Sequence, residues 1–281
     1  MDKKTKYLYS VKLPNNSYKN INVTNATHLE DGYTYVTTTN KYPIMKFESN
    51  EGLLKDPVYM DVFPKTHIKF IGFIKNRPAI IPKNKWNIRV LSNKENGYKC
   101  VTIDSNENLK HKIVEAILDK HPKSCRCESC YQLIGFVHLH GFMIFVQLSC
   151  MHKPDHKLLY IIRTDLNSDS LECKNLQVTN EYNYYQMCLD HGSSEKDAKK
   201  CTFSGLYYYD NKVYLLSTNA NKGYLWQMDY MANISYLARP QFIAKLKHQP
   251  KGIYADGSKL IVVCNNIRNK RMSYYVIKHI Q

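Results

Sequence analysis

The chain has 281 residues, 43% of them hydrophobic, and a formal net charge of +16 at pH 7. This length and apolar content suit one large all-β domain or two ordinary domains, and they exclude a disordered chain. No apolar run reaches the roughly 18–20 residues of a membrane span, and the lysine-rich start lacks the apolar core of a signal peptide. The nine cysteines are an odd number, which indicates reduced thiols and predicts a cytoplasmic protein.

The positive charge has two explanations. A basic balance favours an acidic partner, either nucleic acid, an anionic membrane surface or an acidic protein. The chain is also rich in Lys, Asn, Ile and Tyr together, a composition that an AT-rich genome produces without selection for binding. Both origins stay open on the sequence alone.

A unit consisting of a small residue, a β-hairpin and a third strand recurs along the chain. Copies begin near residues 26, 71, 134, 204 and 251. Each hairpin has turn residues in the same place: Asp31–Gly32, Asn76–Pro78, His140–Gly141, Asp210–Asn211 and Asp256–Gly257. The third strands are predicted at 42–48, 86–91, 158–165, 224–230 and 273–280. Weaker fourth strands are predicted at 58–63, 98–103, 176–179 and 241–247.

The last unit has no fourth strand, whereas the N-terminus offers a spare strand at residues 7–13. Pairing this spare strand into the last sheet would protect unpaired backbone groups and close a ring. This arrangement resembles the β-propeller superfold, whose blades are four-stranded sheets around a central channel. The resemblance covers nearly the whole chain but includes no family signature. It predicts an all-β chain with a single propeller domain over residues 1–281.

The resemblance predicts five blades. Six blades are the alternative, if residues 173–201 form a degenerate blade. A β-sandwich is the other architecture that short, evenly spaced strands allow.

Two insertions interrupt the repeat, at residues 104–129 and 181–200. In the first, Leu109, Ile113, Ala116 and Ile117 have helical spacing and predict a helix over 107–120. This helix either takes part in function or covers a blade edge. The second insertion combines tyrosines with a polar run and predicts a mobile loop.

The first insertion ends in a cluster of soft and borderline ligands, His121, Cys125, Cys127 and Cys130. Four such ligands within ten residues could close a tetrahedral structural zinc site. Unliganded reduced thiols and a redox pair or disulfide are the alternatives. Five further candidate ligands follow: His138, His140, Cys150, His152 and His156.

The innermost strands carry apolar and aromatic residues, and the acids nearest to them fall in hairpin turns, which argues against a paired-carboxylate hydrolase. The sequence identifies no catalytic residue and favours, without deciding the point, a non-enzymatic scaffold that binds an acidic protein through its insertions. The predicted partner-binding residues are Tyr182, Tyr184, Tyr185, Lys196, Lys199 and Lys200. A nucleic-acid-binding propeller and a glycan-binding or hydrolytic propeller are the alternatives.

Overall fold

The computed structural model describes residues 6–11, 23–28, 33–38, 44–50, 53–54, 58–60, 68–74, 77–82, 86, 88–94, 97–103, 107–139, 141–166, 173–219, 222–232, 236–256, 259–266 and 271–278. The chain divides into two compact units. The first unit consists of Met1–Phe70, Ser204–Tyr230 and Pro240–Gln281. The second unit consists of Ile71–Phe203 and Met231–Arg239.

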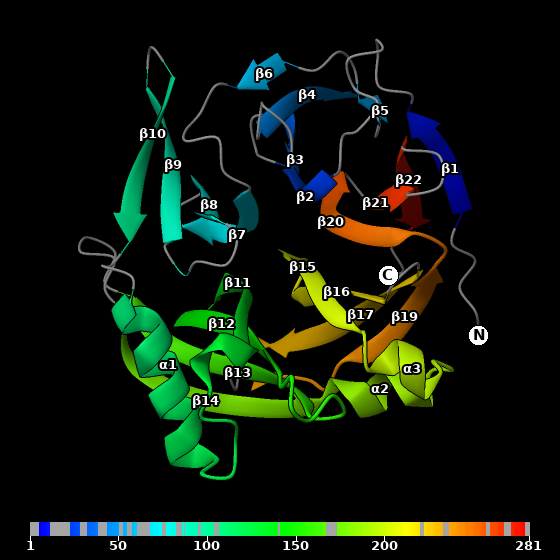
Figure 1. Ribbon diagram of the computed structural model, residues 1–281. Helices are drawn as coiled ribbons and strands as arrows, with labels where there is room; N and C mark the ends of the chain where they lie inside the picture. The colour runs from blue at the N-terminus through cyan, green and yellow to red at the C-terminus, as the bar shows by residue number, and fades with distance from the viewer. Residues whose placement is uncertain are drawn as a thin grey trace. The chain divides into compact units, whose positions relative to one another are not determined.

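Three sheets lie wholly or mainly in the first unit (Figure 1). One sheet contains β2 (Val23–His28), β3 (Tyr33–Thr38), β4 (Ile44–Asn50), β5 (Leu53–Leu54) and β6 (Val58–Met60). The next contains β15 (Thr202–Tyr209), β16 (Lys212–Asn219), β17 (Lys222–Met231), β18 (Tyr236–Leu237) and β19 (Gln241–Leu246). The third contains β20 (Gln249–Asp256), β21 (Lys259–Asn266), β22 (Arg271–Lys278) and β1 (Lys6–Val11).

The second unit contains two sheets and all of the described helices. Its sheets are formed by β7 (Ile68–Ile74), β8 (Arg77–Pro82), β9 (Ile88–Lys94) and β10 (Gly97–Ile103), and by β11 (Tyr131–Leu139), β12 (Gly141–Ser149), β13 (Lys157–Leu166) and β14 (Cys173–Asn183). Its helices are α1 (Glu107–Lys120), the short 3₁₀ helix η2 (Glu128–Cys130), α2 (Tyr184–Asp190) and α3 (Glu195–Ala198).

The strand order within the sheets is that of a β-propeller. Neighbouring strands are consecutive in sequence and antiparallel, apart from the short edge strands. Strand β1 is a further exception, because it pairs with the last strand, β22, and Tyr7 lies opposite Tyr275. This pairing is the one predicted for the N-terminal strand. The chain is therefore an all-β propeller. The number of blades stays a prediction, but residues 173–201, all of them described, form β14, α2 and α3 and contain no other strand.

Small residues allow innermost strands to approach their neighbours closely. A Cβ atom at Gly72 in β7 would collide with the backbone oxygen of Phe136 in β11, and Gly72 has a φ of +145°. In the first unit, a Cβ atom at Gly205 in β15 would lie 3.6 Å from the backbone oxygen of Lys251 in β20. At Gly72 the missing side chain therefore permits close packing between successive sheets, whereas at Gly205 an added Cβ atom would make an ordinary van der Waals contact.

The hairpin turn between β15 and β16 follows the sequence prediction. Asp210 and Asn211 both have positive φ, at 50° and 55°, as a two-residue type I′ turn requires. Buried residues of β16, β17, β20 and β21 form an apolar core beside this turn, including Leu216, Leu225 and Val262.

Helix α1 has the bounds that the apolar spacing predicts. Leu109, Ile113 and Ile117 are at most 1% exposed and belong to the core of the second unit. The helix lies against β14, the outer strand of its sheet (Figure 1). At its C-terminal end, Lys120 Nζ donates a 2.6 Å hydrogen bond to the backbone oxygen of Val178. Helix α1 therefore covers a sheet edge, one of the two roles predicted for it.

Candidate functional site

Three cysteine side chains meet at one end of the β11–β12 hairpin. The Sγ atoms of Cys125, Cys130 and Cys150 all lie within 4.8 Å of one another. Cys130 and Cys150 are buried and Cys125 is half-buried. None of the eight cysteines whose side chains are described forms a disulfide. Three thiol groups at this separation could hold a soft or borderline metal ion.

The register of the hairpin explains why Cys150 belongs to this group. Tyr131 in β11 pairs with Leu148 in β12, so the residues just before β11 and just after β12 are neighbours. Cys130 and Cys150 occupy those two positions. The predicted turn at His140–Gly141 lies midway between the two cysteines, so the pairing could have been inferred from the sequence.

Cys127 lies next to this cluster. It is exposed, and its Sγ lies 2.9 Å from Ser129 Oγ. Hydrogen bonds from the Ser129 hydroxyl and backbone N–H, and from the thiol of Cys130, lower the pKa of Cys127. Burial raises the pKa of Cys130 to about 12. The environment therefore favours the thiolate at the exposed residue and the thiol at its buried neighbour.

Two buried tyrosines hold the backbone before the cluster. Tyr131 OH donates a 2.6 Å hydrogen bond to the backbone oxygen of Cys125, and the hydroxyls of Tyr160 and Ser124 lie 2.5 Å apart. Burial raises the pKa of Tyr131 to about 12, so its hydroxyl stays protonated and remains a donor at neutral pH. These contacts fix the position of Cys125 from the strands beneath it.

His121 is not part of the three-thiol group. Its Nδ1 lies 3.2 Å from Glu181 Oε2, and its Nε2 is buried without a hydrogen-bond partner among the described residues. His138, a further candidate, is exposed and lies beside Phe142 at the turn end of the hairpin. His140 lies outside the described residues. Of the four ligands predicted from the sequence, the structure thus brings Cys125 and Cys130 together and places Cys127 beside them.

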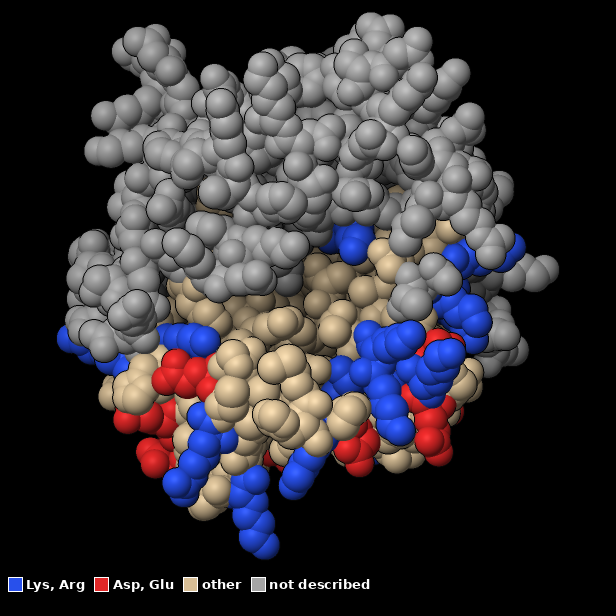
Figure 2. Space-filling model, viewed as in Figure 1, with Lys and Arg blue, Asp and Glu red and all other residues tan. Residues whose placement is uncertain are grey.

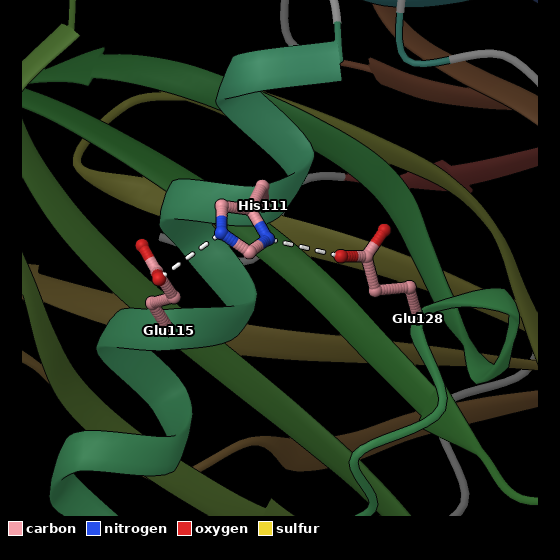
Figure 3. A network of polar contacts seen from close by, with 3 residues as sticks. All are labelled: His111, Glu115 and Glu128. Atoms are coloured by element: carbon pink, nitrogen blue, oxygen red, sulfur yellow. Dashed lines mark hydrogen bonds and ion pairs between the residues drawn. The ribbon is translucent and has the colours of Figure 1, made fainter.

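An exposed polar network joins α1 to the cysteine segment, residues 121–130 (Figure 3). His111 Nε2 lies 3.0 Å from Glu115 Oε1, and His111 Nδ1 lies 3.1 Å from Glu128 Oε1. The hydrogen bond to Glu128 and the charge of Glu115 raise the pKa of His111. The imidazole therefore links the helix to η2, next to Cys127.

The second insertion forms two capped helices, which corrects the prediction of a mobile loop. The Asn183 side chain accepts a hydrogen bond from the backbone N–H of Gln186 at the start of α2. At its end, the backbone N–H groups of Gly192 and Ser193 donate to the oxygens of Leu189 and Cys188, the Schellman arrangement. Ser194 caps α3 by accepting from Asp197 N–H. Asn183, Gly192 and Ser194 are sequence signals for these boundaries.

A buried polar contact anchors α2 and α3 to the sheet. Lys157 in β13 is 3% exposed, and its Nζ donates to Ser149 Oγ at 2.8 Å and to the backbone oxygen of Cys201 at 3.1 Å. Burial lowers the pKa of Lys157. Its Nζ also lies 5.5 Å from the centre of the Tyr184 ring. The ends of the second insertion are therefore tied to one buried cation.

The predicted partner-binding residues divide into a buried and an exposed set. Tyr184 is 1% exposed and packs edge-on against Phe203, so it belongs to the core, and its predicted contact with a partner is wrong. Tyr182 and Tyr185 are half-buried. Lys196, Lys199 and Lys200 are exposed. Figure 2 shows Lys and Arg side chains, with acidic ones among them, gathered over the part of this face where Figure 1 places α2 and α3.

An open groove of about 590 Å³ is lined by residues of α1 and β14. Its charged lining residues are two lysines and two acids, Lys112, Lys120, Glu115 and Asp119. Because two positive and two negative side chains line it, the groove has no single electrostatic preference.

No family model and no curated protein matches the chain. Among solved structures, it is similar to the PQQ-bound aldose sugar dehydrogenase of Streptomyces coelicolor, with 11% identity over 97% of each chain and a TM-score of 0.52. It also matches the β-propeller domain of Nup133 from Vanderwaltozyma polyspora, with 10% identity, 92% of this chain, 71% of the other and a TM-score of 0.42. At these identities the likeness concerns the fold alone.

None of the described helices is long and apolar enough to span a membrane. The cytoplasmic location stays a prediction.

Proposed function

We propose that the protein is a non-enzymatic propeller module that binds an acidic protein partner through the α2–α3 segment, residues 184–200. The observation that carries this proposal is the rigid display of three exposed lysines, Lys196, Lys199 and Lys200, on that segment. Lys199 Nζ lies 3.9 Å from Glu195 Oε2, whereas Lys196 and Lys200 form no ion pair with any described residue. Two exposed cations are thus available to carboxylates of a partner.

The anchoring of the segment supports this function. Ordering a flexible loop costs free energy when a partner binds, and a loop that is already ordered avoids that cost. Here helix caps and the buried residues Tyr184, Cys188 and Cys201 fix the backbone before any partner arrives. The lysine side chains then lose only their own rotamer freedom.

The test is binding of a fluorescently labelled, glutamate-rich peptide, followed by anisotropy at low and physiological salt. The variant is Lys196→Ala/Lys199→Ala/Lys200→Ala. Exposed charge pairs contribute roughly 0.5 kcal/mol each, so loss of three should weaken binding about tenfold. Raising the salt concentration should reduce the difference, because exposed charges are screened.

The matched control removes three exposed lysines of the first unit, in Lys222→Ala/Lys247→Ala/Lys259→Ala. It changes the net charge by the same amount and should leave peptide affinity close to that of the unaltered chain. Equal weakening by both triple variants would show that total charge, and not the α2–α3 segment, attracts the peptide. Tighter binding of a single-stranded oligonucleotide than of the peptide, with a steep salt dependence, would overturn the proposal in favour of nucleic acid.

A further inference from the structure

We propose that Cys125, Cys127, Cys130 and Cys150 form a tetrathiolate site for one Zn²⁺ ion that fixes the segment between α1 and β11. This site is independent of the α2–α3 surface. The proposed ligands differ from those that the sequence spacing suggests, because Cys150, which follows β12, takes the place of His121.

The separation of three sulfur atoms fits the first part of the site. Zinc–sulfur bonds of about 2.3 Å in a tetrahedron place the sulfur atoms ~3.8 Å apart. Cys125, Cys130 and Cys150 already lie within 4.8 Å of one another, so contraction by ~1 Å or less would bring them to bonding distance. Cys125 lies in the loop after α1, Cys130 lies in η2, and Cys150 directly follows β12. The β11–β12 hairpin holds Cys130 and Cys150 next to each other.

Polar contacts already shape the segment around Cys127. The backbone N–H of Cys130 donates a 3.0 Å hydrogen bond to the backbone oxygen of Cys127, and Ser129 Oγ lies 2.9 Å from Cys127 Sγ. A polar group that contacts a ligand sulfur serves as part of the outer shell of a metal site.

Zinc binds deprotonated sulfur, so the thiols release their protons as the ion enters. The divalent charge then offsets the repulsion between thiolates that lie a few ångströms apart. Sulfur ligands in a tetrahedral set select zinc over the hard cations Mg²⁺ and Ca²⁺.

The fourth ligand is assigned to Cys127 because it lies one turn before Cys130, whose backbone N–H donates a 3.0 Å hydrogen bond to the Cys127 backbone oxygen. It is exposed, so a change of its side-chain rotamer can turn the sulfur toward the other three. His121 is the competing ligand. Its Nδ1 is engaged by Glu181 Oε2, and it lies outside the group of sulfur atoms within 4.8 Å.

The first experiment measures zinc by mass spectrometry of the elements in the purified full chain, before and after incubation with Zn²⁺. One zinc per chain is expected, falling to near zero in Cys150→Ser. A chain that takes up no zinc would overturn the site. The triple lysine variant should hold zinc normally, so failure of partner binding and failure of the metal site are distinguishable.

The second experiment identifies the fourth ligand with Co²⁺ as a spectroscopic probe. Cys127→Ser should weaken metal affinity by more than about tenfold, because even outer-shell partners account for about 10–100-fold, and should reduce the sulfur-to-cobalt absorption. His121→Gln should retain both the metal affinity and the sulfur-to-cobalt absorption. If His121→Gln loses affinity and Cys127→Ser does not, His121 is the ligand and the proposal is contradicted. Lys123→Ala, which changes an exposed residue of the same segment that is no proposed ligand, is the matched control.

A third measurement needs no variant and so does not depend on the folding of Cys150→Ser. Iodoacetamide labelling of the native chain should spare the exposed Cys127 when zinc is bound and modify it after treatment with a strong chelator. Rapid labelling of Cys127 in the presence of zinc would overturn its role. A mass two hydrogens lower, without metal, would show a disulfide in place of the site.

Discussion

The α2–α3 segment and the cysteine segment after α1, residues 121–130, are held in place in different ways. The α2–α3 segment has its own buried residues, since Tyr184, Cys188 and Ala198 are at most 1% exposed. By contrast, none of residues 121–129 is buried. That stretch is held by the hydroxyls of Tyr131 and Tyr160, by the His111 network and by its thiols.

This difference indicates what each of the two segments needs in order to fold. A segment that buries apolar side chains against a sheet gains the free energy that orders its backbone. A segment without buried side chains lacks that gain and must obtain it from a ligand. We therefore expect the α2–α3 segment to fold with the sheet and the cysteine segment to depend on a metal ion.

The largest effect is expected where the α2–α3 segment is anchored. Tyr184→Ala removes a buried ring that contacts Phe203 and Lys157, and it should lower the free energy of unfolding by about 3–5 kcal/mol. Urea denaturation measures this change. The neighbouring, half-buried Tyr185→Ala should cost about 1 kcal/mol. Equal losses in the two variants would show that α2 is not anchored by Tyr184.

A smaller effect is expected from metal removal. If free zinc is at 100–1,000 times its dissociation constant, binding stabilises the chain by about 2.7–4.1 kcal/mol, which a chelator should abolish. Hydrogen exchange followed by mass spectrometry should show faster exchange in residues 121–130 after chelation. Exchange in residues 184–200 should stay unchanged. If chelation speeds hydrogen exchange equally in residues 121–130 and 184–200, the metal ion does not stabilise the cysteine segment in particular.

The propeller and α1 were predictable from sequence because both rest on local patterns. Strand alternation, turn residues such as Asp210 and Asn211, and the apolar spacing of Leu109, Ile113 and Ile117 each involve neighbours in the chain. The N-terminal strand was assigned by the need to protect a sheet edge, which is a general constraint.

The site was harder to predict because its members come from distant positions. Cys150 joins Cys130 only through the register of β11 and β12, whereas the short sequence spacing of His121, Cys125, Cys127 and Cys130 favoured a ligand set without Cys150. Tyr184 was misjudged for a different reason. In a polar, tyrosine-rich stretch, sequence alone does not show which ring is buried, and here the Asn183 cap sets the helix phase that turns Tyr184 inward.

The helix caps offer a finer test of how the α2–α3 segment is ordered. Asn183→Ala removes the acceptor for the Gln186 N–H and should cost about 1 kcal/mol of unfolding free energy. Asn183→Gly should cost only a few tenths, because glycine also serves at this position. Urea denaturation of both variants decides the point. A glycine variant less stable than the alanine variant would show that backbone flexibility, and not the cap, governs α2.

The smallest effect concerns the link between α1 and the cysteine segment. The Glu128 hydrogen bond and the Glu115 charge raise the pKa of His111 above its ordinary value near 6.5. A raised pKa in the folded state means that the stabilisation is fully present below about pH 6.5 and disappears as the pH rises through the folded-state value. The difference in unfolding free energy between the unaltered chain and His111→Gln should therefore shrink from acidic to alkaline pH.

Nuclear magnetic resonance of the His111 ring protons separates the two carboxylates. Glu128→Gln should lower the measured pKa more than Glu115→Gln, because the Glu128 hydrogen bond is the larger cause of the shift. Glu128 is the partner on the cysteine segment, so its removal should also speed hydrogen exchange in residues 121–130, whereas Glu115→Gln, within α1, should not. If Glu115→Gln lowers the pKa more, the imidazole is held by its own helix, and the cysteine segment then depends on its thiols and the two tyrosines alone.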